Sequence, residues 1–296
     1  MGKTLYLECN AGISGDMTVA ALLDLGADWE KLKEALDSVP AKGFEVKKSR
    51  VKKSGIDCMD FDVILDAEHE NHDHDMEYLY GHEQHHEHEH HHDHEHQHEH
   101  DHEHHHDHEH HEHEHHHEHE HHHEHRGLPE IEAIIDQTEM SERANATAKK
   151  IFRILAQAES KAHGLPIEQV HFHEVGAIDS IVDIIAVAVC LDLLEIDKVI
   201  IPKLTEGSGT IRCQHGILSI PVPATVNIVT RYKIPMELTQ LKGEMVTPTG
   251  AAIAAAIGTD NRLPDKMLIE QVGLGAGKRD HERDGILRAM LIRETE

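Results

Sequence analysis

Apolar and polar positions follow two periods along the chain, which together predict a mixed α/β fold: a sheet with packed helices. Alternation with a period of two, or a short apolar run, predicts strands at 3–9, 44–51, 58–65, 169–175, 198–204, 210–213, 217–221, 266–272 and 286–292. Apolar residues three or four apart predict helices at 29–39, 128–137, 141–164, 180–196, 223–232 and 251–258, and glycine turns lead into a further helix within 10–27 that ends at Gly26.

Two of these helices carry further signals. The helix at 141–164 has Ser141 as its candidate N-cap and Gly164 just past its end. The helix at 180–196, SIVDIIAVAVCLDLLEI, is apolar nearly all round and lies between two predicted strands. That order predicts a buried helix in a parallel crossover unit.

A low-complexity tract interrupts this pattern and divides the chain into three parts. Between His69 and His125 lie 30 of the 35 histidines and 19 acidic residues, with no Lys or Arg. Nothing in the tract can bury an apolar face, so we expect it to be disordered without metal. The predicted organisation is therefore an N-terminal α/β segment at 1–68, a disordered His/Glu/Asp-rich metal-binding insert at 69–126, and the remainder of the α/β body at 127–296.

Charge and composition exclude several classes of protein. Outside the tract, 37 acids face 28 bases, so no basic stripe is available for a nucleic acid. No apolar run reaches the roughly 18 residues that span a bilayer, and the first residues lack a signal-peptide core. Four widely spaced cysteines indicate reduced thiols. We expect a cytoplasmic protein with no membrane or nucleic-acid partner.

The histidine tract is suited to storing metal. Imidazole binds nickel, zinc and copper, and thirty histidines at about four per ion would hold on the order of seven ions. A redundant, disordered tract cannot supply the fixed geometry that a selective site needs. The alternative is a solvated insert with no bearing on function. The candidate ligands are His85, His86, His88, His90, His91, His92, His104, His105, His106, His115, His116, His117, His121, His122 and His123.

The motif HFHEVG is a more selective candidate site. On an extended backbone, His171 and His173 project to one side, and Glu174 follows at the end of the strand. Asp179 and Asp183 would stack on one face if the next helix has already begun at Asp179. Two imidazoles and a carboxylate fit an open metal site or an acid/base cluster. The alternative is that Ser180 and Asp183 form a capping-box-like helix start and the histidines satisfy nearby backbone groups.

Glycine-rich turns recur at 12–16, 206–210, 247–250 and 273–280. Such turns can expose backbone amides to phosphate. None matches a P-loop or dinucleotide fingerprint, and each alone fits a structural turn. The candidate phosphate-binding residues are Gly12, Gly15, Gly207, Gly209, Thr249, Gly250, Gly275, Gly277 and Arg279, with Arg283 nearby.

Cys9 ends the first predicted strand directly before the first glycine turn. A thiolate there would be a soft ligand and a transfer point for nickel, and the alternative is a buried inert thiol. The chain holds no G-x-S-x-G, no H-E-x-x-H and no kinase signature, so hydrolase and kinase interpretations have no support.

Five segments together resemble one family. In chain order they are LYLECNAGISGDMTVAALLDLG, VHFHEVGAIDSIVDI, EGSGTIRCQHGILSIPVPAT, GEMVTPTGAA and GLGAGKRD, and they resemble the LarC family of nickel insertion proteins. The resemblance implies CTP-dependent insertion of Ni²⁺ into pyridinium-3,5-bisthiocarboxylic acid mononucleotide, a lyase-class reaction that forms the nickel-pincer cofactor of lactate racemase-type enzymes. Family members continue past the last residues of this chain into a region that binds CTP with Mg²⁺ or Mn²⁺, so a C-terminal family polypeptide is an expected partner.

The resemblance and the residues combine into one hypothesis. The tract concentrates nickel and delivers it to His171 and His173, with Glu174 or Asp179 as the base and Asp16 and Cys9 as second-rank candidates. The mononucleotide substrate, a cofactor-receiving racemase and a homo-oligomeric assembly complete the expected partners. The rival classes are a nickel store or chaperone without chemistry of its own, and a zinc buffer.

Overall fold

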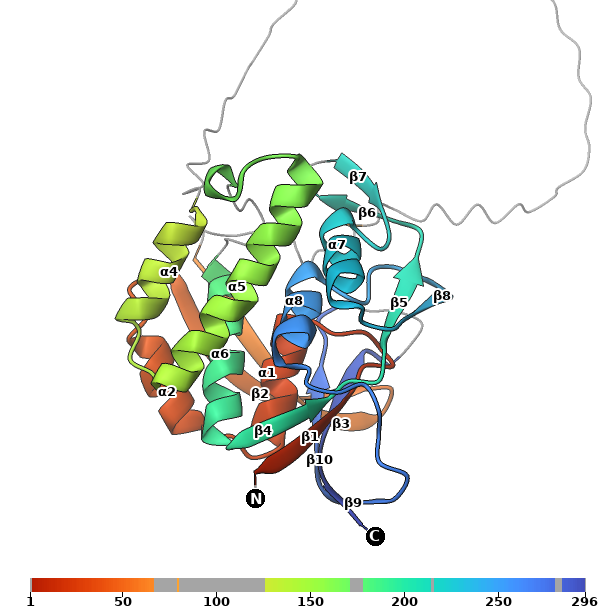
Figure 1. Ribbon diagram of the computed structural model, residues 1–296. Helices are drawn as coiled ribbons and strands as arrows, with labels where there is room; N and C mark the ends of the chain where they lie inside the picture. The colour runs from red at the N-terminus through yellow and green to blue at the C-terminus, as the bar shows by residue number, and fades with distance from the viewer. Residues whose placement is uncertain are drawn as a thin grey trace, which may run out of the picture. The chain divides into compact units, whose positions relative to one another are not determined.

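Six strands form one mixed sheet in the order β2-β3-β9-β10-β1-β4 (Figure 1). The computed structural model describes residues 2–66, 79, 126–170, 178–213, 216–279 and 284–295. They belong to the unit formed by 1–81 and 123–296, while a second unit, 82–122, lies outside the described residues. The sheet strands are β1 (Lys3–Glu8), β2 (Phe44–Lys53), β3 (Ile56–Leu65), β4 (Ile196–Ile200), β9 (Met267–Ala276) and β10 (Ile286–Glu294).

Two short strand pairs and the helices complete the described elements. β5 (Leu204–Ser208) pairs in parallel with β8 (Met236–Lys242), and β6 (Thr210–Cys213) forms a hairpin with β7 (Gly216–Ser219). The helices are α1 (Gly15–Asp24), α2 (Trp29–Asp37), α4 (Leu128–Gln137), α5 (Glu142–His163), α6 (Ile178–Leu193), α7 (Pro223–Tyr232) and α8 (Pro248–Ile257), with the 3₁₀ turn η1 (Ile167–Gln169). The predicted mixed α/β class is confirmed.

The segments on both sides of the histidine tract build the same sheet. β3, from before the tract, lies parallel to β9 at Met59 and Gly275. β1 runs antiparallel to β10 and parallel to β4, both of which follow the tract in sequence. Residues 2–66 therefore cannot complete this sheet without the later part of the chain.

Helix α1 lies directly against β9, and glycines in the strand make this possible. A Cβ at Gly273 would stand 2.2 Å from the Ala21 carbonyl oxygen, and one at Gly275 would stand 2.1 Å from that of Met17. Both contacts would be made with backbone atoms of α1, so no side-chain movement could relieve them. The last glycine turn of the sequence thus has a packing function.

Helix α6 occupies the centre of the helical layers, between α1 and α5 (Figure 1). Apolar residues on all sides of it are buried, including Ile181, Ile185 and Val189. A helix that is apolar all round is stable in water only when neighbours cover every face. The predicted burial of this helix is confirmed.

Several predicted boundaries are confirmed by their caps. Ser141 accepts a hydrogen bond from the Ala144 amide at the start of α5, and Gly164 takes the left-handed conformation at its end. Gly26, with a φ of +106°, ends the turn after α1. The predicted alternation in β3 is also confirmed by the fully buried Phe61.

One predicted strand is wrong. The strand expected at 198–204 is two strands, because β4 ends at Ile200 and Pro202, which has no amide hydrogen, stands before β5. The short strand or extended segment expected at 169–175 does not include Gln169, which belongs to η1; residues 171–177 lie outside the described residues, so the rest of that segment stays a prediction. Among the described strands, the parallel partner of β4 is β1. Strand β8 has no counterpart among the predicted elements.

No helix in the described part of the chain is long and apolar enough to cross a membrane. The predicted disorder of 69–126 is wrong at Leu79, which is helical and buried against Ile211 and Val222. Residues 69–78 and 80–125 lie outside the described residues, and their disorder stays a prediction.

The contact between α1 and β9 predicts a large effect of Gly275→Ala. The new Cβ would meet backbone atoms that cannot yield, so we expect a loss of about 3 kcal/mol in the free energy of unfolding, measured by urea titration. Gly127→Ala is the control, since the one close contact of its Cβ would be the end of the flexible Glu130 side chain at 2.9 Å, while Pro129 and the Val170 carbonyl oxygen would lie at ordinary contact distances. Equal losses in the two variants would contradict this account of the packing.

Candidate functional site

The loop before α1 lies against the loop before α8. The Ile13 amide donates to the Met245 carbonyl oxygen at 2.9 Å, and the Thr247 amide donates to the Ile13 carbonyl oxygen at 3.2 Å. A Cβ at Gly250 would stand 2.0 Å from that same Ile13 oxygen. Two of the glycine turns are therefore packed backbone to backbone, and the N-terminal ends of α1 and α8 come together.

Two more helices begin at the same place. A Cβ at Gly15 would stand 2.4 Å from Oδ2 of Asp183, in the first half of α6. The Thr225 hydroxyl, in the first turn of α7, donates to the Val246 carbonyl oxygen at 3.4 Å. Helix N-termini carry partial positive charge and unpaired amides, so a meeting point of four of them favours anionic groups.

Three carboxylates gather at this meeting point. Asp16 lies in the first turn of α1, and Asp179 and Asp183 lie one turn apart at the start of α6. Oδ2 of Asp16 and Oδ1 of Asp183 are buried and accept no hydrogen bond within the described part of the chain, while the Ser14 hydroxyl donates to Oδ1 of Asp16. We call Asp16, Asp179 and Asp183 the carboxylate cluster.

The electrostatics of the cluster favour keeping a proton. Burial raises the pKa of Asp183 well above its ordinary value, and the like charges of Asp16 and Asp179 raise it further. The ammonium of Lys278 and the backbone amide of Asp16 act in the opposite direction but do not outweigh burial. The environment of the cluster therefore favours the protonated form of Asp183.

Lys278 is the nearest fixed cation to the cluster. Its Nζ lies 2.6 Å from Oδ1 of Asp60 and 3.4 Å from Oδ1 of Asp62, both on β3. Burial alone would lower the pKa of Lys278, but the hydrogen bond to Asp60 and the charges of Asp60, Asp62 and Asp16 outweigh it and raise that pKa. The side chain remains charged and partly offsets the negative charge of the cluster.

A second buried carboxyl group, Glu206 on β5, holds two of the loops together. Its Oε1 accepts hydrogen bonds from the amides of Gly207 at 2.7 Å, Met245 at 2.7 Å and Val246 at 3.2 Å. Burial raises the pKa of Glu206 to about 7, against the lowering effect of the three amides, and the neighbouring Glu244 contributes to the rise. Glu206 begins the glycine turn at 206–210, but the sequence gave its carboxyl group no role, because Met245 and Val246 are about 40 positions away.

An ion pair stands next to this carboxyl group. Nη1 of Arg279 lies 2.5 Å from Oε2 of Glu244, and both side chains are largely buried. Arg279, predicted to contact a phosphate, is therefore already engaged with a carboxylate. Arg283 lies outside the described residues.

Several of the candidate phosphate-binding glycines have backbone amides that already donate a hydrogen bond within the protein. The amide of Gly12 donates to the Cys9 carbonyl oxygen, and that of Gly250 donates to Oγ1 of Thr247. The Gly277 amide donates to the carbonyl oxygen of Gly285. Gly15 begins α1, Thr249 is buried in α8, and Gly275 packs against α1. The Gly207 amide donates to the Glu206 carboxylate, and Gly209 lies between β5 and β6, where a Cβ would meet no atom within 4 Å. Their phosphate-binding role stays a prediction.

Cys9 is buried at the end of β1, and burial raises the pKa of its thiol to about 12. A thiol with such a pKa is neutral at physiological pH, which favours the inert alternative over a nickel ligand.

The predicted metal motif is joined to the cluster through the chain. His171, His173 and Glu174 lie outside the described residues, as do the tract histidines. The motif is followed directly by α6, so Asp179 stands five positions after Glu174. Because α6 already includes Ile178, the alternative with Ser180 at the helix cap is wrong. No group of three His, Cys, Asp or Glu side chains suited to a metal ion exists within the described ranges.

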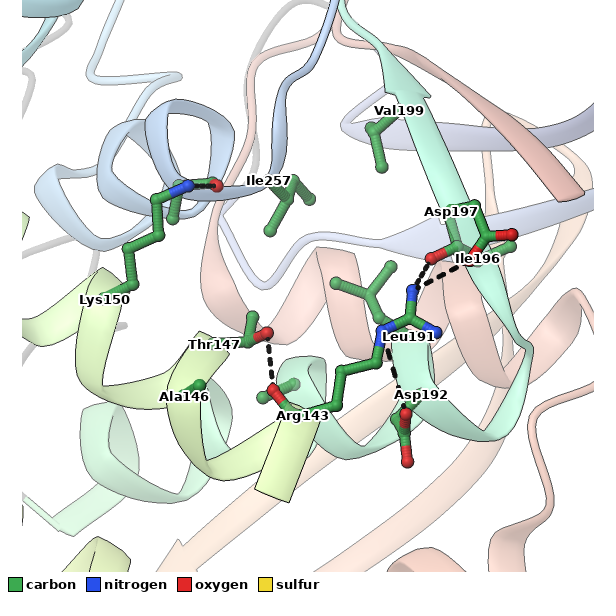
Figure 2. Close-up of a pocket in the computed structure, with 12 residues that line it drawn as sticks. Arg143, Ala146, Thr147, Lys150, Leu191, Asp192, Ile196, Asp197, Val199 and Ile257 are labelled. Carbon is green, nitrogen blue, oxygen red and sulfur yellow. Dashed lines mark hydrogen bonds and ion pairs between the residues drawn. The ribbon is translucent and has the colours of Figure 1, made fainter. Parts of the chain in front are cut away.

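A pocket of about 300 Å³ lies at the C-terminal ends of α6 and α8, beside the first half of α5 and β4 (Figure 2). There Nζ of Lys150 donates to the Ala256 carbonyl oxygen at 2.5 Å, and Arg143 donates to that of Ile196 while pairing with Asp192 and Asp197. These cations are engaged by carbonyl and carboxylate groups near helix C-terminal ends, where positive charge is stabilising. The pocket therefore has a structural explanation and lacks the free charge of a substrate site.

Comparison with known proteins points to one family description, nickel insertion protein, which matches residues 5–296. The chain is 46% identical over 296 residues to the pyridinium-3,5-bisthiocarboxylic acid mononucleotide nickel insertion protein of Alkaliphilus metalliredigens, covering all of this chain and 62% of that protein. Proteins of the same name from Clostridium acetobutylicum and Geobacillus kaustophilus are 41% and 37% identical over 293 and 295 residues, covering 99% of this chain and 64% and 60% of their own lengths. The chain thus spans less than two thirds of these relatives. No solved structure matches it.

The raised pKa of Asp183 predicts a stability effect of Asp183→Asn. A carboxyl group that holds its proton more tightly in the folded state than in the unfolded state loses stability as pH rises above its unfolded pKa of about 4. We therefore expect Asn to raise the free energy of unfolding at pH 7 by about 2 kcal/mol, with a smaller gain at pH 4.

Urea titrations at the two pH values measure this difference. Asp37→Asn, on the exposed face of α2, is the control and should show little change with pH. A gain for Asp183→Asn that is the same at both pH values, or a loss at pH 7, would show that the cluster does not strain the fold.

Proposed function

Because the chain belongs to the nickel insertion protein family, we propose that it inserts Ni²⁺ into pyridinium-3,5-bisthiocarboxylic acid mononucleotide at the head of α6. The observation that carries this proposal is the carboxylate cluster, which lies at the start of the helix that follows the histidine motif. A reaction that bonds nickel to a ring carbon must remove a proton. At the head of α6 three carboxyl groups lie together, and Asp16 and Asp183 each have one buried oxygen that accepts no hydrogen bond from the described residues.

The proposed step balances as a proton-for-metal exchange. The ring C–H bond breaks, its electron pair forms the bond to nickel, and its proton passes to a carboxylate. Two thiocarboxylate sulfurs of the substrate and the imidazoles of His171 and His173 hold the metal during the exchange. Glu174, Asp179 and Asp16 are the candidate acceptors.

The structure favours Asp16 among these acceptors. Burial, with the charges of Asp16 and Asp179, raises the pKa of Asp183 and so disfavours Asp183 itself as the ionised acceptor. Asp16 has one buried oxygen that accepts no hydrogen bond from the described residues, which leaves that oxygen ready to accept a proton. Such a pair separates the roles of acid and base by environment.

The surrounding charges suit the mononucleotide phosphate. Four helix N-termini, Lys278 and Arg279 provide positive potential, while phosphate brings up to two negative charges. Arg279 would share its guanidinium between Glu244 and the phosphate.

The histidine tract is proposed as the nickel store for this site. If the tract has the disorder that its composition predicts, its 57 residues would span roughly 40 Å, so stored nickel would remain within reach at an effective concentration on the mM scale. Protonation of imidazole would release the store as pH falls through about 6.

The remaining features come from the family resemblance. We propose that insertion depends on CTP with Mg²⁺ or Mn²⁺, belongs to the lyase class, and serves a lactate racemase-type enzyme. Since the chain spans less than two thirds of its relatives, the CTP step is assigned to the part of the family found beyond this sequence, or to a partner polypeptide. The four free thiols agree with a cytoplasmic location, and a homo-oligomer stays a prediction.

The rival proposals are a nickel store without chemistry and a zinc buffer. Removing residues 69–125 separates store from site: it should abolish most nickel binding in equilibrium dialysis but preserve insertion at saturating nickel, followed by the absorbance of the pincer product. The double variant His171→Ala with His173→Ala should abolish insertion but preserve most of the nickel binding.

His163→Ala is the control for these variants, since His163 lies at the end of α5, outside both the motif and the tract. Insertion that fails at every nickel concentration after the deletion would exclude the reservoir. Insertion that survives the double substitution would exclude the motif, and a preference for zinc in the dialysis would favour the buffer.

Asp16→Asn tests the proton acceptor. An amide cannot accept the ring proton, so we expect the single-turnover rate of insertion to fall by a factor of about 10² to 10⁴ with nickel binding retained. Asp28→Asn, at the N-cap of α2, carries the same chemical change away from the cluster. If the insertion rate of Asp16→Asn equals that of the control, Asp16 is not the base, and Glu174 and Asp179 remain as the candidates.

A further inference from the structure

Glu206 is a fully buried carboxyl group for which the proposed reaction has no direct use. One oxygen accepts three backbone amides, and the other, Oε2, is buried and accepts no hydrogen bond in the part of the chain that the structure describes. Burying a carboxyl group in this way costs stability, because a neutral acceptor could serve the same amides without the desolvation of a charge. A role beyond packing would account for its presence.

The amides that Glu206 binds belong to a loop with two functional connections. Met245 and Val246 follow Glu244 directly, and Glu244 holds the guanidinium of Arg279 at 2.5 Å. The Met245 carbonyl oxygen accepts the amide of Ile13 at 2.9 Å, in the loop that leads to Asp16. A shift of this loop would therefore move both the ion pair and the start of α1.

Backbone hydrogen bonds also hold this loop, from the Gly243 amide to the Ser208 carbonyl oxygen and from the Ile13 amide to the Met245 carbonyl oxygen. Glu206 adds the contact from β5 that lies next to Glu244. Gly243 and Gly207 approach so closely that a Cβ at Gly207 would stand 1.9 Å from the Gly243 carbonyl oxygen, which leaves no room for side chains between β5 and the loop. The Glu206 carboxyl group bridges this approach from β5 to two successive amides. Its position thus sets where Glu244 stands.

We infer that Glu206 is a positioning residue for substrate binding, which places Arg279 through Glu244 to receive the phosphate of a pyridine mononucleotide. This inference rests on the proposed function for the identity of the substrate. It assigns Glu206 an effect on affinity for the mononucleotide and no part in the transfer of the ring proton.

The charge on Glu206 should matter as well as its shape. An ionised carboxylate binds amides more strongly than a neutral one, and the pKa of about 7 places this change near neutral pH. The charged groups that face it are Glu244, which raises that pKa, and beyond it Arg279, which pairs with Glu244. Glu206 should therefore hold the amides of the loop more strongly as pH rises from 6 to 8.

The test measures binding of nicotinic acid mononucleotide, which carries a pyridinium ring, a carboxylate and the phosphate, and needs neither nickel nor CTP. Glu206→Gln keeps an acceptor oxygen but removes the charge, and we expect its Kd at pH 8 to be about tenfold weaker than that of the unsubstituted chain, as for loss of one charge-assisted hydrogen bond. At pH 6, where Glu206 itself is protonated, the difference should shrink to less than about threefold.

Three further variants separate positioning from general destabilisation. Glu237→Gln, on β8 and exposed, is the matched control and should bind like the unsubstituted chain. Glu244→Gln should weaken binding by a similar factor, and the double variant Glu206→Gln with Glu244→Gln should be no weaker than either single variant, because both act on Arg279. Urea titration confirms that each variant is folded at the pH of the binding measurement.

The outcomes are distinct. An unchanged Kd in Glu206→Gln, additive losses in the double variant, or a loss that is equal at pH 6 and pH 8 would overturn the inference, as would absence of binding by the unsubstituted chain. If nickel insertion fails while the Kd values shift as expected, the proposed function fails and the positioning role stands. At saturating mononucleotide, the single-turnover insertion rate of Glu206→Gln should stay within about threefold of normal, which separates this residue from Asp16.

Discussion

The close backbone contact between the loop at 10–14 and the loop at 243–250 is the constraint on which the rest of the site depends. Gly12 and Gly250 allow it, since a Cβ at either position would stand 2.0 Å or less from a carbonyl oxygen of the opposite loop. With these loops in contact, α1 and α8 must begin side by side, and α6 and α7 meet them there. The positive ends of the helices, the carboxylate cluster and the Glu244–Arg279 pair are all consequences of that meeting.

The same arrangement explains why a costly group of charges can persist. Burial and mutual repulsion disfavour ionised carboxyl groups at the head of α6, but helix N-termini and Lys278 supply compensating positive potential. The raised pKa of Asp183 shows that this compensation is incomplete. Local destabilisation of this kind is common where a site must exchange protons or bind charged ligands, and it trades stability for function. The burial of the large apolar layers around α6 stabilises the fold and offsets this cost.

Local sequence patterns predicted most of the fold and only part of the site. The caps at Ser141 and Gly164, the all-round apolar α6 and the alternation around Phe61 depend on neighbouring residues, so they were visible in the sequence. Strand β8 was missed because it depends on pairing with the distant β5. The break between β4 and β5 was missed although Pro202 is a local signal for it. Asp16 and Asp179 were identified from their turns, and the four-residue spacing placed Asp183 beside Asp179. Glu206 and Glu244 could not be identified, since their roles arise from contacts between segments about 40 positions apart. The glycines were recognised, but the structure shows them first as places of close packing.

Nickel K-edge X-ray absorption on the chain without residues 69–125, loaded with one equivalent of Ni²⁺, tests the central claim most directly, because it reports the ligands of the metal at the site without the tract histidines. The account predicts a first shell with two imidazoles, lost when His171 and His173 are both alanine and retained when only His163 is. A first shell without imidazole, or one that the double substitution leaves unchanged, would contradict the claim that nickel enters at the head of α6.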